Sequence, residues 1–160
     1  IDGGEIGQCA QSCLHAPNRV INGVAGSIGA ALPFATAAAF TKPGVPVVAV
    51  MGDGTFGFHS SELDTAVRYQ LPFIGVVGND ACWNAEYQIQ IREYGQERAK
   101  GCELLPSRYD QVALAFGGAG ELVTDALDVL PAAQRLQAKG LPAILNILIE
   151  GLPAPNLKRS

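Results

Sequence analysis

Short apolar runs alternate with polar, helix-like segments along this chain. The clearest run covers residues 47–51, and runs at 73–77 and 143–149 are of the same kind. Apolar runs without an alternating polar position are typical of strands that are buried on both faces of a parallel sheet. Residues 60–69, between the first two runs, carry apolar side chains at helical spacing. The pattern therefore predicts a strand–helix–strand unit with parallel strands.

The rest of the chain continues this pattern. Further helices are predicted at 8–14, 30–40, 84–94, 108–116 and 128–139, and shorter strands at 1–2, 19–22 and 121–123. At 160 residues the chain is expected to form one domain, residues 1–160. We predict an α/β fold of three layers, in which a mostly parallel sheet of about six strands carries helices on both faces.

Composition narrows the class of protein. Hydrophobic residues make up 48% of the chain and charged residues only 16%, which excludes a disordered polar chain. The net charge of −4 gives no attraction to nucleic acid or to an anionic membrane surface. Each apolar run is too short to span a membrane. The four cysteines lack the spacing of a zinc site and fit a reducing compartment, so we expect a cytoplasmic protein.

Polar residues follow the first two buried runs at the point where each run ends. Asp53 lies in a Gly-Asp-Gly turn after the first run, and Asn79 and Asp80 follow the second. Because neighbouring parallel strands end at the same edge of a sheet, these oxygens are expected to lie near one another. Such a set suits a divalent cation that carries a phosphorylated ligand. Spacing alone leaves open that Asp53 is a helix cap and that residues 79–80 form a solvated turn.

A second glycine-rich loop, residues 23–29, raises the alternative of a nicotinamide site. Its glycines follow G-x-x-G-x-x-G, whereas the dinucleotide-binding fingerprint is G-x-G-x-x-G. No acidic residue stands where the ribose would need one. A Rossmann-type nicotinamide-binding domain is therefore disfavoured, and the absence of a G-K-[ST] sequence excludes a P-loop.

Residues 48–83 resemble the cofactor motif of thiamine-diphosphate-dependent enzymes: G-D-G, a spacer of one strand–helix–strand unit, then N-N. The loop 26–29, the Ala-Leu-Pro at 31–33 and the helix residues 62–63 and 65–69 are similar to the acetolactate synthase and pyruvate decarboxylase group. The likeness covers nearly the whole chain. It implies the thiamine-diphosphate-binding fold and, within it, the C-terminal diphosphate-binding domain.

The resemblance implies a Mg²⁺ site. Asp53 stands at the position of the first side-chain ligand. The second asparagine of N-N, the other side-chain ligand, falls on Asp80, which is a departure from the family pattern. A slip of one residue would make Asn79 the ligand instead. The main-chain carbonyl ligand falls on Cys82 in the first alignment and on Ala81 in the second.

The resemblance also implies contacts with thiamine diphosphate. Gly54 and Thr55 would offer N–H and hydroxyl groups to the diphosphate, Gly26 a carbonyl to the aminopyrimidine, and Ile28 an apolar wedge that bends the cofactor. Ile28 and Trp83 could instead be ordinary packing residues. The full predicted cofactor set is Gly4, Glu5, Ile6, Gly26, Ser27, Ile28, Gly52, Gly54, Thr55 and Trp83.

The implied activity is decarboxylation and carboligation of a 2-oxo acid such as pyruvate, as a lyase or transferase similar to acetolactate synthase. No catalytic residue is assigned in this chain, because in the family the activating glutamate lies on a separate pyrimidine-binding domain. We expect a fragment or subunit of a homo-oligomeric enzyme that is inactive until this domain or subunit completes the site. The alternative is a non-catalytic domain that retains the fold for binding.

Overall fold

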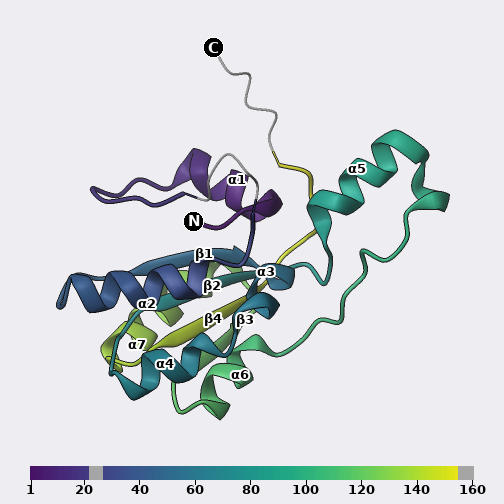
Figure 1. Cartoon of the computed structure of the whole chain (residues 1–160). Helices are drawn as coiled ribbons and strands as arrows, with labels where there is room; N and C mark the ends of the chain where they lie inside the picture. The colour runs from purple at the N-terminus through teal and green to yellow at the C-terminus, as the bar shows by residue number, and fades with distance from the viewer. Residues whose placement is uncertain (22–26, 155–160) are drawn as a thin grey trace.

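Four parallel strands form one sheet in the computed structural model, which describes residues 1–21 and 27–154. The strands are β1 (Val48–Gly52), β2 (Ile74–Asn79), β3 (Ala119–Val123) and β4 (Ala143–Leu148). Their order in the sheet is β1-β2-β4-β3, and every neighbouring pair is parallel (Figure 1). Parallel neighbours need long crossover connections, and the helices supply these.

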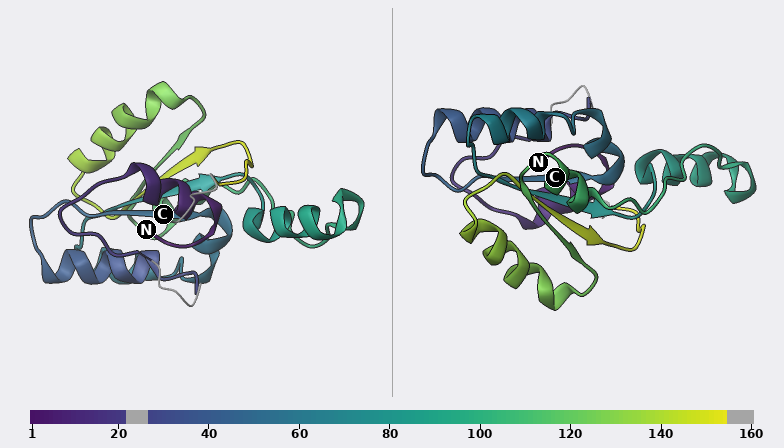
Figure 2. Two further views of the ribbon diagram at one scale, coloured as in Figure 1. Left: turned by 90° about the horizontal axis from the view of Figure 1, so that it is seen from above. Right: turned by 90° about the horizontal axis from the view of Figure 1, so that it is seen from below.

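Helices cover both faces of this sheet. They are α1 (Gly4–Cys13), α2 (Ala31–Thr41), α3 (Asp53–Phe58), α4 (Glu62–Arg68), α5 (Asn84–Tyr94), α6 (Tyr109–Ala115) and α7 (Val129–Ala138), with short 3₁₀ turns η1 (Gln96–Arg98) and η2 (Ala126–Asp128). Helix α5 projects away from the sheet beyond the ends of the strands in both views of Figure 2. Across the described part of the chain, no helix is long and apolar enough to cross a membrane.

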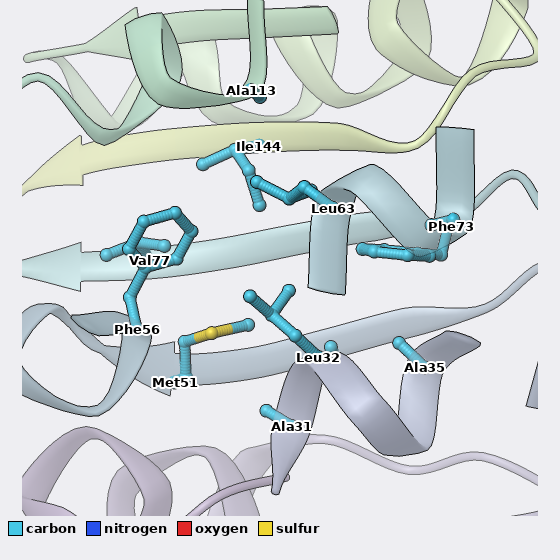
Figure 3. Packing of buried hydrophobic residues seen from close by; sticks show 12 residues of the cluster. Ala31, Leu32, Ala35, Met51, Phe56, Leu63, Phe73, Val77, Ala113 and Ile144 are labelled. Carbon is cyan, nitrogen blue, oxygen red and sulfur yellow. The ribbon is translucent and has the colours of Figure 1, made fainter. Parts of the chain in front are cut away.

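The two faces of the sheet carry separate hydrophobic clusters. On one face Met51, Val77 and Ile144 pack against helices α2, α3 and α4 (Figure 3). On the other face Leu145 packs against Leu136 of α7. The neighbours Ile144 and Leu145 thus face opposite sides, as the two-residue period of a strand requires. Burial of each such side chain stabilises the folded state by about 1.5–3 kcal/mol. This burial holds both layers of helices against the sheet.

The three-layer α/β architecture with a parallel sheet and helices on both faces is confirmed, but the expected count of about six strands is wrong. Residues 1–2 make one ladder bond to β1, from Asp2 N to Val50 O at 2.8 Å, and do not extend it. Residues 19–21 form no strand, and the guanidinium group of Arg19 donates to the carbonyl oxygen of Leu14, the residue after α1, at 2.8 Å. Residue 22 lies outside the described residues.

Two glycine-rich segments, one of them the Gly-Asp-Gly sequence expected to be a turn, form the first turns of helices. Helix α1 begins at Gly4, and a Cβ at Gly7 would come within 2.0 Å of Asp2 O. Only glycine allows the helix to approach this backbone so closely. Likewise, the Gly-Asp-Gly sequence after β1 opens helix α3 at Asp53. Both helix starts lie at the carboxyl edge of the sheet, where ligands bind in open α/β folds.

Candidate functional site

A cavity of about 220 Å³ opens at the carboxyl edge of the sheet, between the ends of β1 and β2 and the start of α1. The strand register pairs Gly52 with Gly78, so Asp53 and Asp80, which come after them, reach the same cavity. The predicted site residues that line it are Gly4, Glu5, Ile6, Ile28, Gly52, Asp53, Gly54, Thr55, Asp80, Cys82 and Trp83. The structure therefore brings together both glycine-rich helix starts and the end of β2.

Asp53 is the most buried charged group of the cavity, with 2% of its surface exposed. Its Oδ1 accepts a hydrogen bond from Gly54 N at 2.8 Å, but its Oδ2 has no hydrogen-bond partner in the described structure. Burial raises the pKa of this carboxyl to about 6, and the nearby charge of Asp80 adds to the rise. A buried oxygen without a partner costs about 1–3 kcal/mol, so this atom is suited to a cation.

Asn79 and Asp80 point in opposite directions. The Asn79 side chain is buried, and its Nδ2 donates to Ser107 O at 3.0 Å and to Asn146 Oδ1 at 3.1 Å. It does not line the cavity, whereas Asp80 does. Burial raises the pKa of Asp80, and hydrogen bonds from the backbone of Cys82 and from the Asn84 side chain partly offset this. The two residues of the predicted N-N position thus have different surroundings.

The backbone after Asp80 pairs with a second segment of the chain. Leu104 N donates to Ala81 O at 2.7 Å, and Cys82 stands opposite Glu103 in an antiparallel bridge. Because Trp83 N also donates to Cys102 O at 2.8 Å, the bonds flank the Cys82–Glu103 pair, and the main-chain groups of Cys82 point away from the partner segment. Burial, with the Asp80 charge, raises the pKa of the Cys82 thiol to about 11. Hard divalent cations take oxygen ligands, so the main-chain carbonyl of Cys82, rather than its thiol, is the candidate ligand.

The charged side chains that line the cavity are all acidic. They are Glu5, Asp53, Asp80 and Glu86, and no lysine, arginine or histidine among the described residues joins them. An anionic ligand would be repelled unless a cation accompanied it. No group of three or more His, Cys, Asp or Glu side chains that could hold a metal occurs in residues 1–21 and 27–154. A Mg²⁺ ion with one or two carboxylates, phosphate oxygens and waters needs no such group.

Two helices begin at the cavity and present N–H groups to it. The first turns of α1 and α3 contain Gly4 and Gly54, both of which line the cavity. Such N–H groups lack the main-chain partners that later turns have and favour negative charge, although the N–H of Gly54 donates to the Asp53 side chain. The Glu5 carboxylate also accepts a hydrogen bond from Ala154 N, which ties the end of the described chain to α1. The acidic cavity therefore has main-chain donors for an anion.

Trp83 lies directly against the start of α3. A Cβ on Gly54 would meet the indole ring at 2.7 Å, so glycine is required for this contact. The indole also meets the Phe58 ring edge to face, with the ring centroids 5.8 Å apart. Trp83 lines the cavity as the only tryptophan of the sequence. Its emission is therefore a direct probe of the site.

The second glycine loop contributes only in part. Ile28 lines the cavity, whereas Ser27 is exposed and does not, and Gly26 lies outside the described residues. Asp2, which the sequence reasoning missed, fixes the end of this loop. Its buried carboxylate accepts hydrogen bonds from Gly29 N at 3.1 Å and from the first residue of α2 at 2.8 Å. An aspartate before glycines often accepts hydrogen bonds from main-chain N–H groups, but the sequence does not show which distant residues donate them.

Other lining residues were also missed: Gly3, Gln8, Gly78, Asn84, Ala85, Glu86 and Ile149. Most are neighbours in sequence of residues that were predicted. A second, larger cavity of about 460 Å³ lies at the opposite, amino edge of the sheet. It is lined mainly by apolar residues such as Val48 and Leu71 and contains none of the predicted site residues.

Known proteins match this chain over nearly its whole length. Residues 2–147 match the family described as "Thiamine pyrophosphate enzyme, C-terminal TPP binding domain". The acetolactate synthase large subunit IlvG of Mycobacterium tuberculosis is 37% identical over 154 residues, which are 94% of this chain and 28% of that protein. The 2-hydroxyacyl-CoA lyase 2 of Homo sapiens is 32% identical over 157 residues, 93% of this chain and 24% of that protein. The chain thus spans about a quarter of the length of these relatives.

Proposed function

This chain belongs to the thiamine pyrophosphate enzymes, as a C-terminal TPP-binding domain, and from that premise we propose that its cavity binds Mg²⁺ together with the diphosphate of the cofactor. The observation that carries this proposal is Asp53 Oδ2, a buried carboxylate oxygen without a hydrogen-bond partner in the described structure. It lies near a second, half-buried carboxylate, Asp80, in a cavity whose charged residues are all acidic. A divalent cation would neutralise both groups.

The proposed protein ligands of Mg²⁺ are the carboxylates of Asp53 and Asp80 and the main-chain carbonyl of Cys82. Asp80 is favoured over Asn79 because Asp80 lines the cavity, whereas bonds from the Asn79 amide to Ser107 O and Asn146 Oδ1 hold that side chain away from it. Cys82 is favoured over Ala81 because the Ala81 carbonyl accepts from Leu104 N. Two carboxylates and one carbonyl leave room in an octahedral shell for phosphate oxygens and water.

The diphosphate is proposed to lie between the helix starts. The main-chain N–H and hydroxyl of Thr55 at α3, and the N–H groups of residues 4–6 at α1, would donate to its oxygens. The N–H of Gly54, which donates to Asp53 Oδ1 in this structure, would turn to the diphosphate when it binds. Ile28 and Trp83 line the same cavity and would give apolar contacts to the rest of the cofactor. The Gly26 and Ser27 contacts remain predictions.

The whole enzyme is proposed to act on a 2-oxo acid such as pyruvate, by decarboxylation and carboligation. Bound thiamine diphosphate would supply the electron sink that this bond cleavage needs. The residues of this chain would bind, orient and shield the cofactor, while the activating glutamate would come from a pyrimidine-binding domain or subunit. The names of the relatives, one a synthase and one a lyase, support both a transferase and a lyase class. A cytoplasmic homo-oligomer is part of the proposal.

Trp83 fluorescence tests the cofactor site. We expect the emission to change when Mg²⁺ and thiamine diphosphate are added together, and not with either one alone. The variant Asp80→Ala, which leaves no side-chain oxygen at this position, should raise the Mg²⁺ concentration for half of the change at least tenfold. Its matched control is Asp64→Ala, which removes a carboxylate from an exposed ion pair with Arg68. If the chain joined to a pyrimidine-binding domain showed no emission change, the site assignment would be wrong.

A separate assay tests the reaction. Release of carbon dioxide from pyruvate should appear when the chain is combined with a pyrimidine-binding domain, and should be absent with the chain alone. Cofactor binding without turnover in the combined protein would favour the non-catalytic alternative. The sequence feature that would fit this alternative is Asp80, which stands where the family has asparagine. Turnover by the chain alone, above a cofactor-only blank, would contradict the proposed division of roles.

A further inference from the structure

We propose that Asn146 and Asp110 are positioning residues for the metal ligand Asp80, and that they act through Asn79. The inference rests on the proposed function and adds to it residues that lie outside the cavity. It depends on a buried hydrogen-bonded network that joins the end of β2 and the middle of β4 to the start of α6.

The network consists of side chains that are almost completely buried. Asn79, Asp110 and Asn146 have 2%, 1% and 0% of their surface exposed. Asn79 Nδ2 donates to Asn146 Oδ1 at 3.1 Å, and Asn146 Nδ2 donates to Asp110 Oδ1 at 3.3 Å. Both amides also donate to the carbonyl oxygen of Ser107, at 3.0 and 3.1 Å. The two strands are thereby bonded to one another and to the segment before α6.

Asp110 anchors this network by charge. The guanidinium group of Arg108 donates to both of its oxygens, at 2.9 and 2.6 Å, and Gln111 donates to it at 3.2 Å. A two-pronged bond of this kind fixes the carboxylate in one orientation. Asp110 then fixes the amide of Asn146, which has no freedom to rotate without losing a buried bond.

The direction of Asp80 follows from the direction of Asn79. In an extended segment, successive side chains point to opposite sides. The network holds the Asn79 side chain on the α6 face, so the next side chain is turned toward the cavity. Ala81 N donates to Asn79 Oδ1 at 3.3 Å, which also fixes the peptide that follows Asp80. Ala81 has a positive φ of 54°, a conformation that L residues rarely adopt without support from their surroundings.

Removal of the Asn146 amide would release this arrangement. In Asn146→Val, one hydrogen of Asn79 loses its acceptor and Asp110 loses a donor. The Asn79 side chain would then change its rotamer to form another hydrogen bond, and the backbone at residues 79–81 would rotate with it. The Asp80 carboxylate would still be present but no longer held toward the ion.

The test uses the Mg²⁺ concentration for half of the Trp83 emission change, at saturating thiamine diphosphate. We expect Asn146→Val to raise it at least tenfold and Asp110→Asn, which keeps the shape and one acceptor, at least threefold. Thr36→Val is the matched control, because it removes a buried hydroxyl that bonds Leu32 O within α2. This control should leave the Mg²⁺ value within twofold even where it lowers the melting temperature equally.

Hydrogen exchange of the metal-free protein gives a second readout. Exchange in residues 79–83 should be faster in Asn146→Val than in the wild type, with exchange in β1 unchanged. An unchanged Mg²⁺ value in either folded network variant would overturn the inference while leaving the proposed function intact. A wild type that shows no Mg²⁺-dependent emission change would overturn both.

Discussion

Gly54, in the first turn of α3, is in close contact with the indole ring of Trp83. A Cβ there would stand 2.7 Å from two atoms of the indole ring, whereas a Cβ on Gly57, one turn later in the same helix, would meet nothing within 4 Å. The two glycines therefore have different reasons to be glycine. At position 54 the indole ring leaves no room for a side chain, whereas at position 57 a side chain would meet no other atoms of the structure.

We predict that Gly54→Ala displaces the indole and lowers the free energy of unfolding by about 1–3 kcal/mol, as overpacking does. It should also shift the Trp83 emission maximum before any ligand is added. Gly57→Ala should stabilise α3 by about 0.5–1 kcal/mol, because alanine loses less entropy in a helix. Denaturant unfolding of both variants measures the difference, and equal stabilities would contradict the close contact.

The buried Asp53 carboxylate is expected to destabilise the metal-free fold but to be required for Mg²⁺ binding. Its carboxylate is buried, lacks a partner at Oδ2 and lies near the charge of Asp80. We predict that Asp53→Asn stabilises the metal-free protein by about 1 kcal/mol, because a buried charge is removed. The same variant should lose the Mg²⁺-dependent Trp83 response. Thermal unfolding in a chelator and the emission titration measure the two effects, and a strongly destabilised metal-free variant would contradict the reasoning.

The start of helix α6 carries a pH dependence. Burial raises the pKa of Asp110, but hydrogen bonds from Arg108, Asn146 and Gln111 outweigh it and leave the pKa below its ordinary value. A lowered folded-state pKa contributes stability above the unfolded value of about 3.9. That stability is lost as the pH falls through the folded pKa. The helix should therefore loosen from β4 only in acid.

We predict that Asp110→Asn lowers the free energy of unfolding at pH 7 by about 1–3 kcal/mol, the cost of disturbing a buried charged hydrogen bond. The difference from the wild type should begin to narrow below about pH 4, where Asp110 becomes protonated in the unfolded chain, and should narrow further as the pH falls through the lower pKa of the folded state. Urea unfolding at several pH values measures this. A difference that stayed constant down to pH 3 would exclude Asp110 ionisation as its source.

Helix α5 differs from the other helices in how little of it is buried. It projects from the carboxyl edge of the sheet, and Asn84 at its start is its buried residue (Figure 1). Elements with few buried contacts open locally at low cost. We predict that amides of residues 86–94 exchange at least tenfold faster than those of β4, as measured by hydrogen exchange. Equal protection would mean that α5 packs as firmly as the sheet.

At the scale of the whole molecule, the sequence predicted what local patterns determine. The buried strands were visible as apolar runs, and their parallel pairing placed Asp53 and Asp80 at one edge. The bonds that depend on distant partners were not visible. Asp2 meets Gly29 only after folding, and Asn79 and Asn146 lie 67 residues apart. Nor could the pattern at 19–21 reveal that the Arg19 side chain would bond to Leu14 O, just after α1.

The charge of the whole cavity leads to the last prediction. Because its charged lining residues are all acidic, neither partner of the proposed complex should bind well alone. Mg²⁺ alone would lack the phosphate oxygens that complete its shell, and thiamine diphosphate alone would meet four carboxylates. Together, at about a hundredfold excess over the dissociation constant, they should stabilise the fold by about 2.7 kcal/mol.

For a chain of this size that corresponds to a rise of about 5–10 °C in melting temperature. The measurement is thermal unfolding with Mg²⁺, with thiamine diphosphate, with both, and with both plus a chelator. Mg²⁺ with thiamine, which lacks the phosphates, is the matched control and should give no rise. A rise with thiamine diphosphate in the presence of the chelator would contradict the argument, because an anion would then be held by the helix starts against four carboxylates. The acidic lining of the cavity thus requires that Mg²⁺ and thiamine diphosphate bind together.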